Sequence, residues 1–434
     1  MSDWKTVTLG TLGSTFAGLS GKRGDDFGEG SPYIPYMNVF SSARIDTSHF
    51  DLVKIEPGER QNQVRYGDIF FTTSSETVED VGTTSVLTEE MQGTYLNSFC
   101  FGFRLHSFEQ LLPEFAAYLL RGQSCRKAIS DLGQGSTRYN LPKTILLQRL
   151  TLNLPPLPEQ RKIASILTTV DRLIEQTEAL IEKYRRVKQG MMADLLSRGV
   201  DEHGKLRPTQ KQAPQLYKQS ELGWIPKEWE VERLEDVSRS LITYGIVQPG
   251  PHVVGGVPFV QTKNLTKGVL NVAAMDRTSK TIAESYQRSA VATGDIVCGI
   301  RATVGITLEI PPSLDGANIS RGVARLSPKS EYNKRYILWA LRSVTVQGAI
   351  DREVKGTTYA EVTLPALRGV KVMVPRRAEQ DRVADVITSC DDRIGKETLH
   401  LTKLRTLKTG LMQDLLTGKV RVKVDNDEEA TADV

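Results

Sequence analysis

The chain has 434 residues, of which 39% are hydrophobic and 25% charged, and its formal net charge is +4. These values are typical of globular proteins and exclude a histone-like polycation, and the length allows two to four domains. No stretch approaches the roughly 20 apolar residues that span a bilayer. The N-terminus MSDWKTVTLG lacks a signal-peptide pattern, and the four cysteines form no CxxC pair. We therefore expect a cytoplasmic protein without a zinc site or a disulfide framework.

Residues 1–154 are predicted to form a first globular domain. Short β-like runs at residues 33–37, 68–72 and 100–105 alternate with turns rich in Gly and Pro, and one clear helix follows at residues 109–121. This pattern is typical of a mixed α/β or α+β unit. The domain holds 14 Lys and Arg against 17 Asp and Glu, a net charge of 14 − 17 = −3.

Residues 155–198 are predicted to form one long amphipathic helix. Apolar side chains recur every seven residues from Ile163, and the intervening apolar positions widen the stripe. Prolines at 155, 156 and 158 stand where a helix begins. A helix of this length measures about 60 Å and is not stable alone, so it requires a partner face.

The rest of the chain repeats this plan. Residues 199–218 are rich in Gly, Pro, Gln and Lys and are interpreted as a linker, and residues 219–374 as a second mixed α/β domain with a helix at 331–347. Residues 375–424 are predicted to form a second long helix with its flanks, and residues 425–434, with five acids and no base, a disordered acidic tail. The second domain and the second helix each carry a net charge of +4, from 19 − 15 and 11 − 7.

An internal duplication is the strongest signal in the sequence. A constant offset of 220 aligns residues 159–196 with residues 379–416, and 14 of the 38 positions are identical. Weaker matches keep the same order, among them YGDIFF with TGDIVC and GSTRY with GTTY. So long a period indicates a duplicated domain and not a solenoid repeat. We expect two similar surfaces, and a partner that offers two similar sites.

The predicted fold is α+β: two similar mixed α/β domains joined by two long antiparallel helices packed as a coiled coil, with pseudo-twofold symmetry. The expected helix-pair interface consists of Ile163, Ile166, Val170, Leu173, Leu180, Tyr184, Val187, Met191, Val383, Val386, Cys390, Ile394, Leu401, Leu404, Leu407 and Leu411. In the alternative interpretation, each helix packs only on its own domain. A metal site at Cys390, Glu397 and His400 is disfavoured because the Cys-to-His spacing does not fit a zinc finger.

Motifs of catalytic machinery are missing from the sequence. There is no GxxxxGK[ST], no GxGxxG that opens a helix, no HExxH and no Asn/Asp-Pro-Pro-aromatic tetrapeptide. Glu76, Glu79 and Asp80 could form a nuclease metal site, but the second domain has no counterpart and a loop explains them better. Two copies of such a domain suggest a binding protein.

The helical segments carry a resemblance to a known family. The strings PPLPEQRKIASILTTVDRLIE, KQGMMADLLSRGV, SELGWIPKEWE and LKTGLMQDLLTGKV resemble the specificity (S) subunits of type I restriction–modification systems. The resemblance covers nearly the whole chain in the family's order of target-recognition domain, helix, second target-recognition domain and second helix. The recognition domains themselves supply only short matches such as GDI and GST/GTT.

The resemblance implies a non-catalytic subunit that reads double-stranded DNA. Each recognition domain would read one half of a bipartite, asymmetric target, and the helices would set the gap. They would also dock two modification subunits that methylate adenine with S-adenosylmethionine, and restriction subunits would add ATP- and Mg-dependent translocation and cleavage. This chain would bind no cofactor or metal itself. Half-sites one DNA turn apart lie about 34 Å from each other, within reach of domains on helices of about 60 Å.

Candidate DNA contacts are polar and basic residues in loops near the junctions of domain and helix, because Arg, Lys, Asn and Gln read base edges while hydroxyl and basic groups hold phosphates. In the first domain these are Lys22, Arg23, Tyr36, Asn38, Ser74, Ser75, Thr137 and Arg138, and in the second Tyr244, Gln248, Gln261, Lys263, Asn264, Arg301, Lys355, Thr357 and Thr358. Arg301 fits the family's Gly-Asp-Ile…Arg pattern, but the same position of the first domain falls near Ser74. A matching role there is therefore open.

Two other classes of protein remain possible. A duplicated coiled-coil scaffold would show no DNA sequence preference, and a nuclease would cleave DNA alone in the presence of metal. Neither explains the order of domains and helices as well as a bipartite DNA reader does. The target sequence, the gap length and the type I subfamily cannot be read from the chain.

Overall fold

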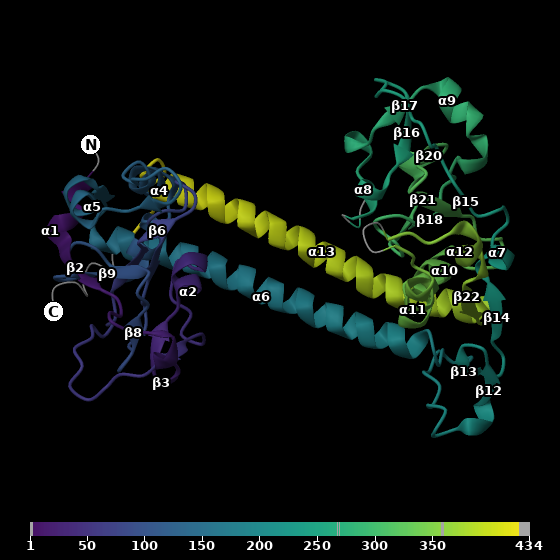
Figure 1. Ribbon diagram of the computed structural model, residues 1–434, viewed down its shortest axis with the longest axis horizontal. Helices are drawn as coiled ribbons and strands as arrows, with labels where there is room; N and C mark the ends of the chain where they lie inside the picture. The colour runs from purple at the N-terminus through teal and green to yellow at the C-terminus, as the bar shows by residue number, and fades with distance from the viewer. Residues whose placement is uncertain (1–2, 267, 269, 357–359, 425–434) are drawn as a thin grey trace. The chain divides into compact units, whose positions relative to one another are not determined.

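The computed structural model describes residues 3–266, 268, 270–356 and 360–424. The chain divides into two compact units, one made of Met1–Glu178 with Leu399–Val434 (unit 1) and the other of Ala179–Thr398 (unit 2). Each unit holds one globular domain and a part of each long helix, α6 (Leu157–Leu195) and α13 (Arg377–Leu415) (Figure 1). Within the described residues, no helix is long and apolar enough to cross a membrane.

The domain of unit 1 is built around an antiparallel sheet in the order β2-β9-β5-β7. Its helices and strands are β1 (Lys5–Thr8), α1 (Leu9–Leu12), β2 (Gly13–Ala17), β3 (Phe27–Ile34), α2 (Tyr36–Ser41), β4 (Asp51–Val53), β5 (Ile69–Thr72), β6 (Ser74–Ser75), β7 (Thr84–Val86), β8 (Tyr95–Leu96), β9 (Cys100–Leu105), α3 (Pro113–Leu119), α4 (Gln123–Ser130), β10 (Tyr139–Asn140), α5 (Lys143–Arg149) and β11 (Thr151–Leu154). A second sheet, β4-β3-β8, covers another part of the core. The rings of Phe71 and Phe101 stack at 5.2 Å in the interior, and both side chains are fully buried.

The domain of unit 2 repeats this plan with the sheets β15-β21-β18-β19 and β17-β16-β20. Its elements are β12 (Tyr217–Ser220), β13 (Gly223–Pro226), β14 (Glu230–Arg233), α7 (Leu234–Val237), β15 (Thr243–Tyr244), β16 (Val257–Val260), α8 (Thr262–Leu265), β17 (Arg277–Thr278), α9 (Lys280–Ser285), β18 (Ile296–Gly299), β19 (Thr307–Glu309), β20 (Asn318–Ile319), β21 (Val323–Leu326), α10 (Lys334–Leu341), α11 (Val344–Arg352), α12 (Leu364–Gly369) and β22 (Lys371–Val374). β5 and β18 occupy the same central place, and β3 with β8 and β16 with β20 are the parallel pairs. The prediction of two similar mixed α/β domains is confirmed.

The long helices run antiparallel inside each unit. In unit 1, Lys408 lies 2.5 Å from Asp171, and Arg405 lies 2.6 Å from Glu178, so the partner number on α6 rises as the number on α13 falls. In unit 2, Lys188 pairs with Asp391 and its ammonium lies 4.5 Å from the centre of the Trp339 ring. Because Lys188 and Asp391 correspond to Lys408 and Asp171 at the offset of 220, the same cross-helix pair is made twice.

Each long helix begins with a buried Glu-Gln pair that ties it to its surroundings. Glu159 accepts both 2.7 Å hydrogen bonds of the Arg421 guanidinium and one from the Trp4 indole at 3.2 Å. Glu379 is bound in the same way by Arg207 and by the Trp229 indole at 3.2 Å. Through Arg207, the segment 199–218, predicted as a linker, contacts the start of α13. The repeated Glu-Gln sequence is explained by a structural role.

The adjoining glutamines fix the helices to the domain loops. Gln160 donates to the carbonyl oxygens of Gln110 and Pro155 and accepts from the Leu112 amide. Gln380 likewise donates to the Pro375 carbonyl at 2.8 Å and accepts from the Asn333 amide at 2.8 Å. Both side chains are buried, and a buried amide that has its partners resists displacement.

The predicted helix-pair interface is narrower than the apolar stripe. Val170, Leu401 and Leu404 are buried along the pair, whereas Ile163 and Val383 are fully buried in the cores of the domains. Ile166, Leu180, Tyr184, Met191, Cys390, Ile394 and Leu411 are half-buried. The prediction is wrong for Leu173, Val187, Val386 and Leu407, which are 41–51% exposed. A single facing helix covers only part of so broad a stripe. The start of each long helix packs on the domain that precedes it in the chain and its end on the other domain, so the alternative interpretation, in which each helix packs only on its own domain, is wrong.

Candidate nucleic-acid interface

A tight turn delivers the central strand of each domain to the candidate interface. In the Gly-Asp-Ile sequence before β5, the Asp68 carboxylate accepts from the Arg65 amide and is held by Arg104 at 2.6 Å. Burial raises the pKa of Asp68, and the hydrogen bonds and charge of Arg104 oppose this rise. Asp295 before β18 binds the Ala292 amide and Arg239 in the same way. The aspartates therefore fix the turn before each central strand, and the candidates Ser74 and Arg301 follow the far end of that strand.

In unit 1 the residues that follow β5 border a hollow of about 880 Å³. Its lining includes five of the predicted DNA contacts, Tyr36, Ser74, Ser75, Thr137 and Arg138. They come from three separate segments: the start of α2, the strand β6, and the loop before β10, which pairs antiparallel with β6. Burial raises the pKa of the Tyr36 hydroxyl, so this group stays protonated at neutral pH and can donate a hydrogen bond. The tertiary structure thus gathers these five residues at one site.

The two domains place a guanidinium at the equivalent strand end from different positions in the chain. In unit 2, Arg301 follows β18 and its Nε and Nη2 lie 2.9 and 2.7 Å from Glu361. In unit 1, Ser74 stands at the equivalent place, and the Nε of Arg138 donates to its hydroxyl at 2.9 Å. The basic group that the first domain lacks on its strand is therefore supplied by the loop before β10.

Three other candidates of unit 1 have partners within the protein. Lys22 pairs with Glu59 at 2.5 Å and its side chain is 7% exposed, and hydrogen bonds from Lys22, Gln61 and the Glu56 backbone amide lower the pKa of Glu59 to about 2. Asn38 is buried, and its amide donates to the carbonyl oxygens of Asp46 and His49. The Arg23 amide donates to Asp26, while the residue itself is exposed. Lys22 and Asn38 therefore have structural roles in this geometry.

The candidates of unit 2 are less closely gathered. Lys355 exchanges two backbone hydrogen bonds with Glu361 and so lies beside Arg301. The backbone amide of Gln261 donates to the side-chain oxygen of Asn264, and Lys263 pairs with Asp276 at 2.6 Å. Tyr244 is half-buried and Gln248 is exposed. Thr357 and Thr358 lie outside the described residues. Arg301 and Lys355 thus form the basic part of the candidate site in this domain.

Sequence reasoning did not name three residues near these sites as DNA contacts, although it considered one of them, Glu76, for a metal site. Glu76 and Phe99 line the hollow of unit 1, and Phe99 is 60% exposed. Arg321 is exposed in the turn before β21. Its neighbour Gly322 lies close to Arg301, because a Cβ added to Gly322 would be 3.7 Å from the Cβ of Arg301. An exposed aromatic residue has no signature in sequence, because a buried phenylalanine looks the same until the fold is known.

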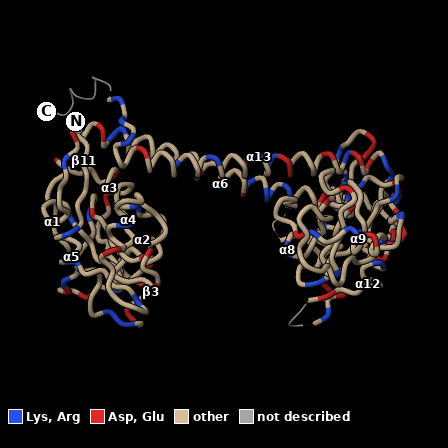
Figure 2. The backbone as a smooth tube through the Cα atoms, turned by 90° about the horizontal axis from the view of Figure 1, so that it is seen from above, with Lys and Arg blue, Asp and Glu red and all other residues tan. Residues whose placement is uncertain are grey.

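Charge is mixed over both domains. Basic and acidic residues are both spread over each globular domain (Figure 2). In the part of the chain that the structure describes, no group of three His, Cys, Asp or Glu side chains is arranged to hold a metal ion. Asp80, one of the acids considered for a metal site, accepts a hydrogen bond from the Thr77 hydroxyl at 2.6 Å. Any phosphate contact must therefore come from local groups such as Arg138 and Arg301.

Comparison with known proteins agrees with this architecture. The family described as type I restriction modification DNA specificity domain matches residues 1–183 and 226–404. The chain is 27% identical over 439 residues to the chain named as the MjaX specificity subunit of a type I restriction enzyme from Methanocaldococcus jannaschii, covering 97% of this chain and 94% of that one. It is also 27% identical over 245 residues to the EcoBI specificity subunit of Escherichia coli, covering 55% and 50% of the two chains.

A solved structure shares the fold. The crystal structure of the S subunit of a type I restriction–modification system from M. genitalium superposes with a TM-score of 0.58 and covers 95% of this chain and 96% of that one. Sequence identity to it is 15%, so the likeness concerns the fold alone.

Proposed function

Because the chain belongs to the family of type I restriction–modification DNA specificity domains, we propose that it is the non-catalytic subunit that selects the DNA target of such a system. Each domain reads one half of a bipartite, asymmetric sequence in double-stranded DNA. The observation that carries this proposal is the duplicated strand end, where Arg138 in unit 1 and Arg301 in unit 2 place a guanidinium beside loop residues with hydroxyl or amino groups.

The chemistry of each site suits recognition of DNA. A guanidinium can donate two hydrogen bonds to the O6 and N7 atoms of guanine or hold a phosphate, and hydroxyl groups adapt to either. In unit 1, Glu76 adds an acceptor that suits the amino group of cytosine or adenine, and the exposed ring of Phe99 can contact a thymine methyl group. The two sites differ in residues, as an asymmetric target requires.

The long helices set the gap between the half-sites and dock two modification subunits. These partners methylate adenine with S-adenosylmethionine, and restriction subunits with ATP and Mg complete the endonuclease. What supports this part of the proposal is the internal repeat, which gives both units the same Lys–Asp pair and the same Glu–Arg–Trp arrangement. Exposed apolar side chains such as Val187 and Leu407, which correspond at the offset of 220, remain for a partner.

A methylome tests the proposal. Methylated adenines are mapped in cells that carry the gene with its modification partner and in cells that lack this gene alone. We expect one bipartite motif with a fixed unspecified gap to be methylated only when the gene is present. Unchanged methylation, or loss of a single contiguous motif, would support the rival interpretation of a duplicated coiled-coil scaffold.

A further inference from the structure

Aromatic rings form part of the wall of the hollow in unit 1. Tyr36, Phe40 and Phe99 all line it, and the rings of Tyr36 and Phe40 stack with their centres 5.9 Å apart. The Phe99 side chain is 60% exposed. The same lining contains Ser74 and Arg138, which are joined by a hydrogen bond of 2.9 Å. The hollow therefore combines an apolar wall with groups that can form hydrogen bonds to DNA.

A tight turn between β8 and β9 presents the Phe99 ring. The Phe99 amide donates to the side-chain oxygen of Asn97 at 2.8 Å, and the Phe99 carbonyl accepts from the Thr73 amide at 2.9 Å. Asn97 is itself buried, and its side chain donates to the Ile34 carbonyl at 3.0 Å. A turn held on both sides loses little further freedom when a partner binds, so little affinity is lost in ordering this ring.

Unit 2 forms the same turn without the aromatic ring. The Ile300 amide donates to the Gly322 carbonyl at 2.9 Å, so Gly322 stands at the place of Phe99. Thr262 begins α8 as Tyr36 begins α2, and a Cβ added to Gly322 would lie only 2.7 Å from the Cγ2 of Thr262. The glycine is therefore required by its neighbour, and unit 2 has no side chain at this point.

The side chain that unit 2 exposes at this turn is a cation. Arg321 directly precedes Gly322 and is exposed, whereas the corresponding residue of unit 1 is the exposed Ser98. The two domains thus keep the hydrogen bond that positions the turn beside the strand end but present different chemistry there. In a duplicated reader of an asymmetric target, a position that keeps its backbone and changes its side chain is suited to carry sequence information.

We propose that this turn determines specificity in both domains, and that Phe99 selects a thymine in the half-site of unit 1 through the 5-methyl group of the base. This inference rests on the proposed function and names the feature of the DNA that one residue reads. The methyl group of thymine projects into the major groove, where an apolar side chain recognises it. In unit 2 the turn reads no methyl group, and the Arg321 guanidinium suits guanine instead.

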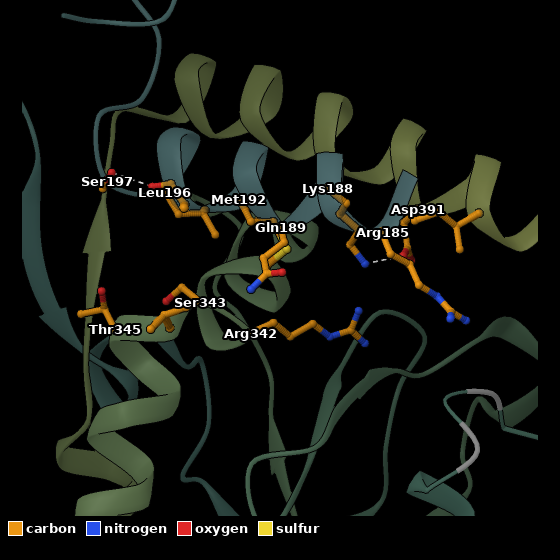
Figure 3. A pocket seen from close by; sticks show the side chains of 13 residues that line it. Arg185, Lys188, Gln189, Met192, Leu196, Ser197, Arg342, Ser343, Thr345 and Asp391 are labelled. Carbon is orange, nitrogen blue, oxygen red and sulfur yellow. Dashed lines mark hydrogen bonds and ion pairs between the residues drawn. The ribbon is translucent and has the colours of Figure 1, made fainter. Parts of the chain in front are cut away.

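The volume of a cavity alone does not identify such a site. A groove of about 560 Å³ in unit 2, lined by residues of α6 and α11, also contains apolar side chains and cations (Figure 3). These cations are engaged within the chain, because Lys188 pairs with Asp391 and the Arg342 guanidinium donates to Thr307 at 3.2 Å. What distinguishes the hollow of unit 1 is an exposed ring on a fixed turn, next to the candidate DNA contacts.

The test measures DNA binding by fluorescence anisotropy with the full-length chain in complex with its modification subunit. The duplexes contain the motif found by the methylome, and each thymine of either strand is replaced in turn by uracil, which lacks only the methyl group. Phe99→Ala removes the ring and Phe99→Leu keeps an apolar side chain. Phe27→Ala is the matched control, because Phe27 is 39% exposed in the same domain and lies outside the lining of the hollow. Circular dichroism verifies that each variant folds.

We expect uracil to weaken binding about fourfold at one thymine or more of the half-site that Arg138→Ala relaxes, since one buried methyl group contributes an amount of this order. The effect should vanish in Phe99→Ala, remain in part in Phe99→Leu and persist in full in Phe27→Ala.

Three results overturn the assignment of Phe99. One is a motif in which no thymine shows this dependence on Phe99. Another is an equal loss of affinity by Phe99→Ala on thymine and uracil duplexes, which would indicate stacking or a backbone contact. The third is unchanged DNA affinity with weaker binding of the modification subunit, which would indicate that a protein covers the ring. A wild-type complex that does not prefer the motif to a scrambled duplex refutes the proposed function itself.

Discussion

The ion pair of Arg301 and Glu361 makes a quantitative prediction for DNA binding. Glu361 accepts a hydrogen bond from the Nε of Arg301 and lies 2.7 Å from its Nη2, and the guanidinium has further N–H groups that can reach a base or a phosphate. Both side chains are 40% exposed, so DNA can approach the pair without unfolding the loop. Arg301→Ala removes this donor and also leaves the Glu361 carboxylate facing the DNA.

The expected magnitude follows from the contact. One good guanidinium contact with a base or a phosphate contributes about 1–3 kcal/mol, so Arg301→Ala should weaken DNA binding about 5- to 150-fold. If the contact is to a phosphate, the slope of log affinity against log salt should fall by about 1. Glu361→Gln should act in the opposite direction and strengthen binding by a few fold, because it removes a negative charge beside the backbone of the DNA.

The assay is fluorescence anisotropy with a duplex that contains the methylated motif, at several salt concentrations. Arg335→Ala is the matched control, since Arg335 also pairs with a glutamate, Glu309 at 3.9 Å, on an element outside the candidate site. Subunit assembly should stay intact in all variants. An affinity of Arg301→Ala equal to that of the wild type at every salt concentration would refute the reasoning.

Four further predictions concern other parts of the molecule. Arg138→Ala should relax the methylated motif in only one of its half-sites, which methylome mapping detects; relaxation in both would contradict independent reading by the two domains. Arg207→Ala should destabilise the chain by about 3–5 kcal/mol, since it leaves the buried Glu379 carboxylate without its cationic partner. Arg421→Ala should destabilise it less, because the Arg421 side chain is 42% exposed and that of Arg207 is 10% exposed. Thermal unfolding that ranks the two variants in reverse would count against this. Glu59 has a pKa lowered to about 2, so its contribution to stability is present above about pH 4.5 and is lost as the pH falls toward 2; a carboxyl NMR titration should show this low pKa and a rise toward the ordinary value in Lys22→Gln, partial because the hydrogen bonds from Gln61 and the Glu56 amide remain. Inserting one helical turn into α6 should change the gap of the motif while both half-sites stay the same; a changed half-site would contradict the role of the helices in spacing.

The sequence was sufficient for the plan of the molecule because the plan depends on periodic patterns. The apolar residues at helical spacing predicted two long helices, and the structure has them as 39 residues each. The offset of 220 predicted that both halves repeat one architecture, and it also relates pairs such as Lys188–Asp391 and Lys408–Asp171. Patterns of this kind can be recognised in the sequence before the fold is known.

Only the tertiary structure decided which of the candidate residues share a site. Tyr36, Ser74 and Arg138 are far apart in sequence and line one hollow, whereas Asn38, two residues after Tyr36, is buried among backbone carbonyl groups. One partner helix covers only part of a broad apolar stripe. The sequence does not tell which part, and the structure leaves Val187 45% exposed. Composition and spacing determine which faces can be buried, but only long-range packing decides which of them are.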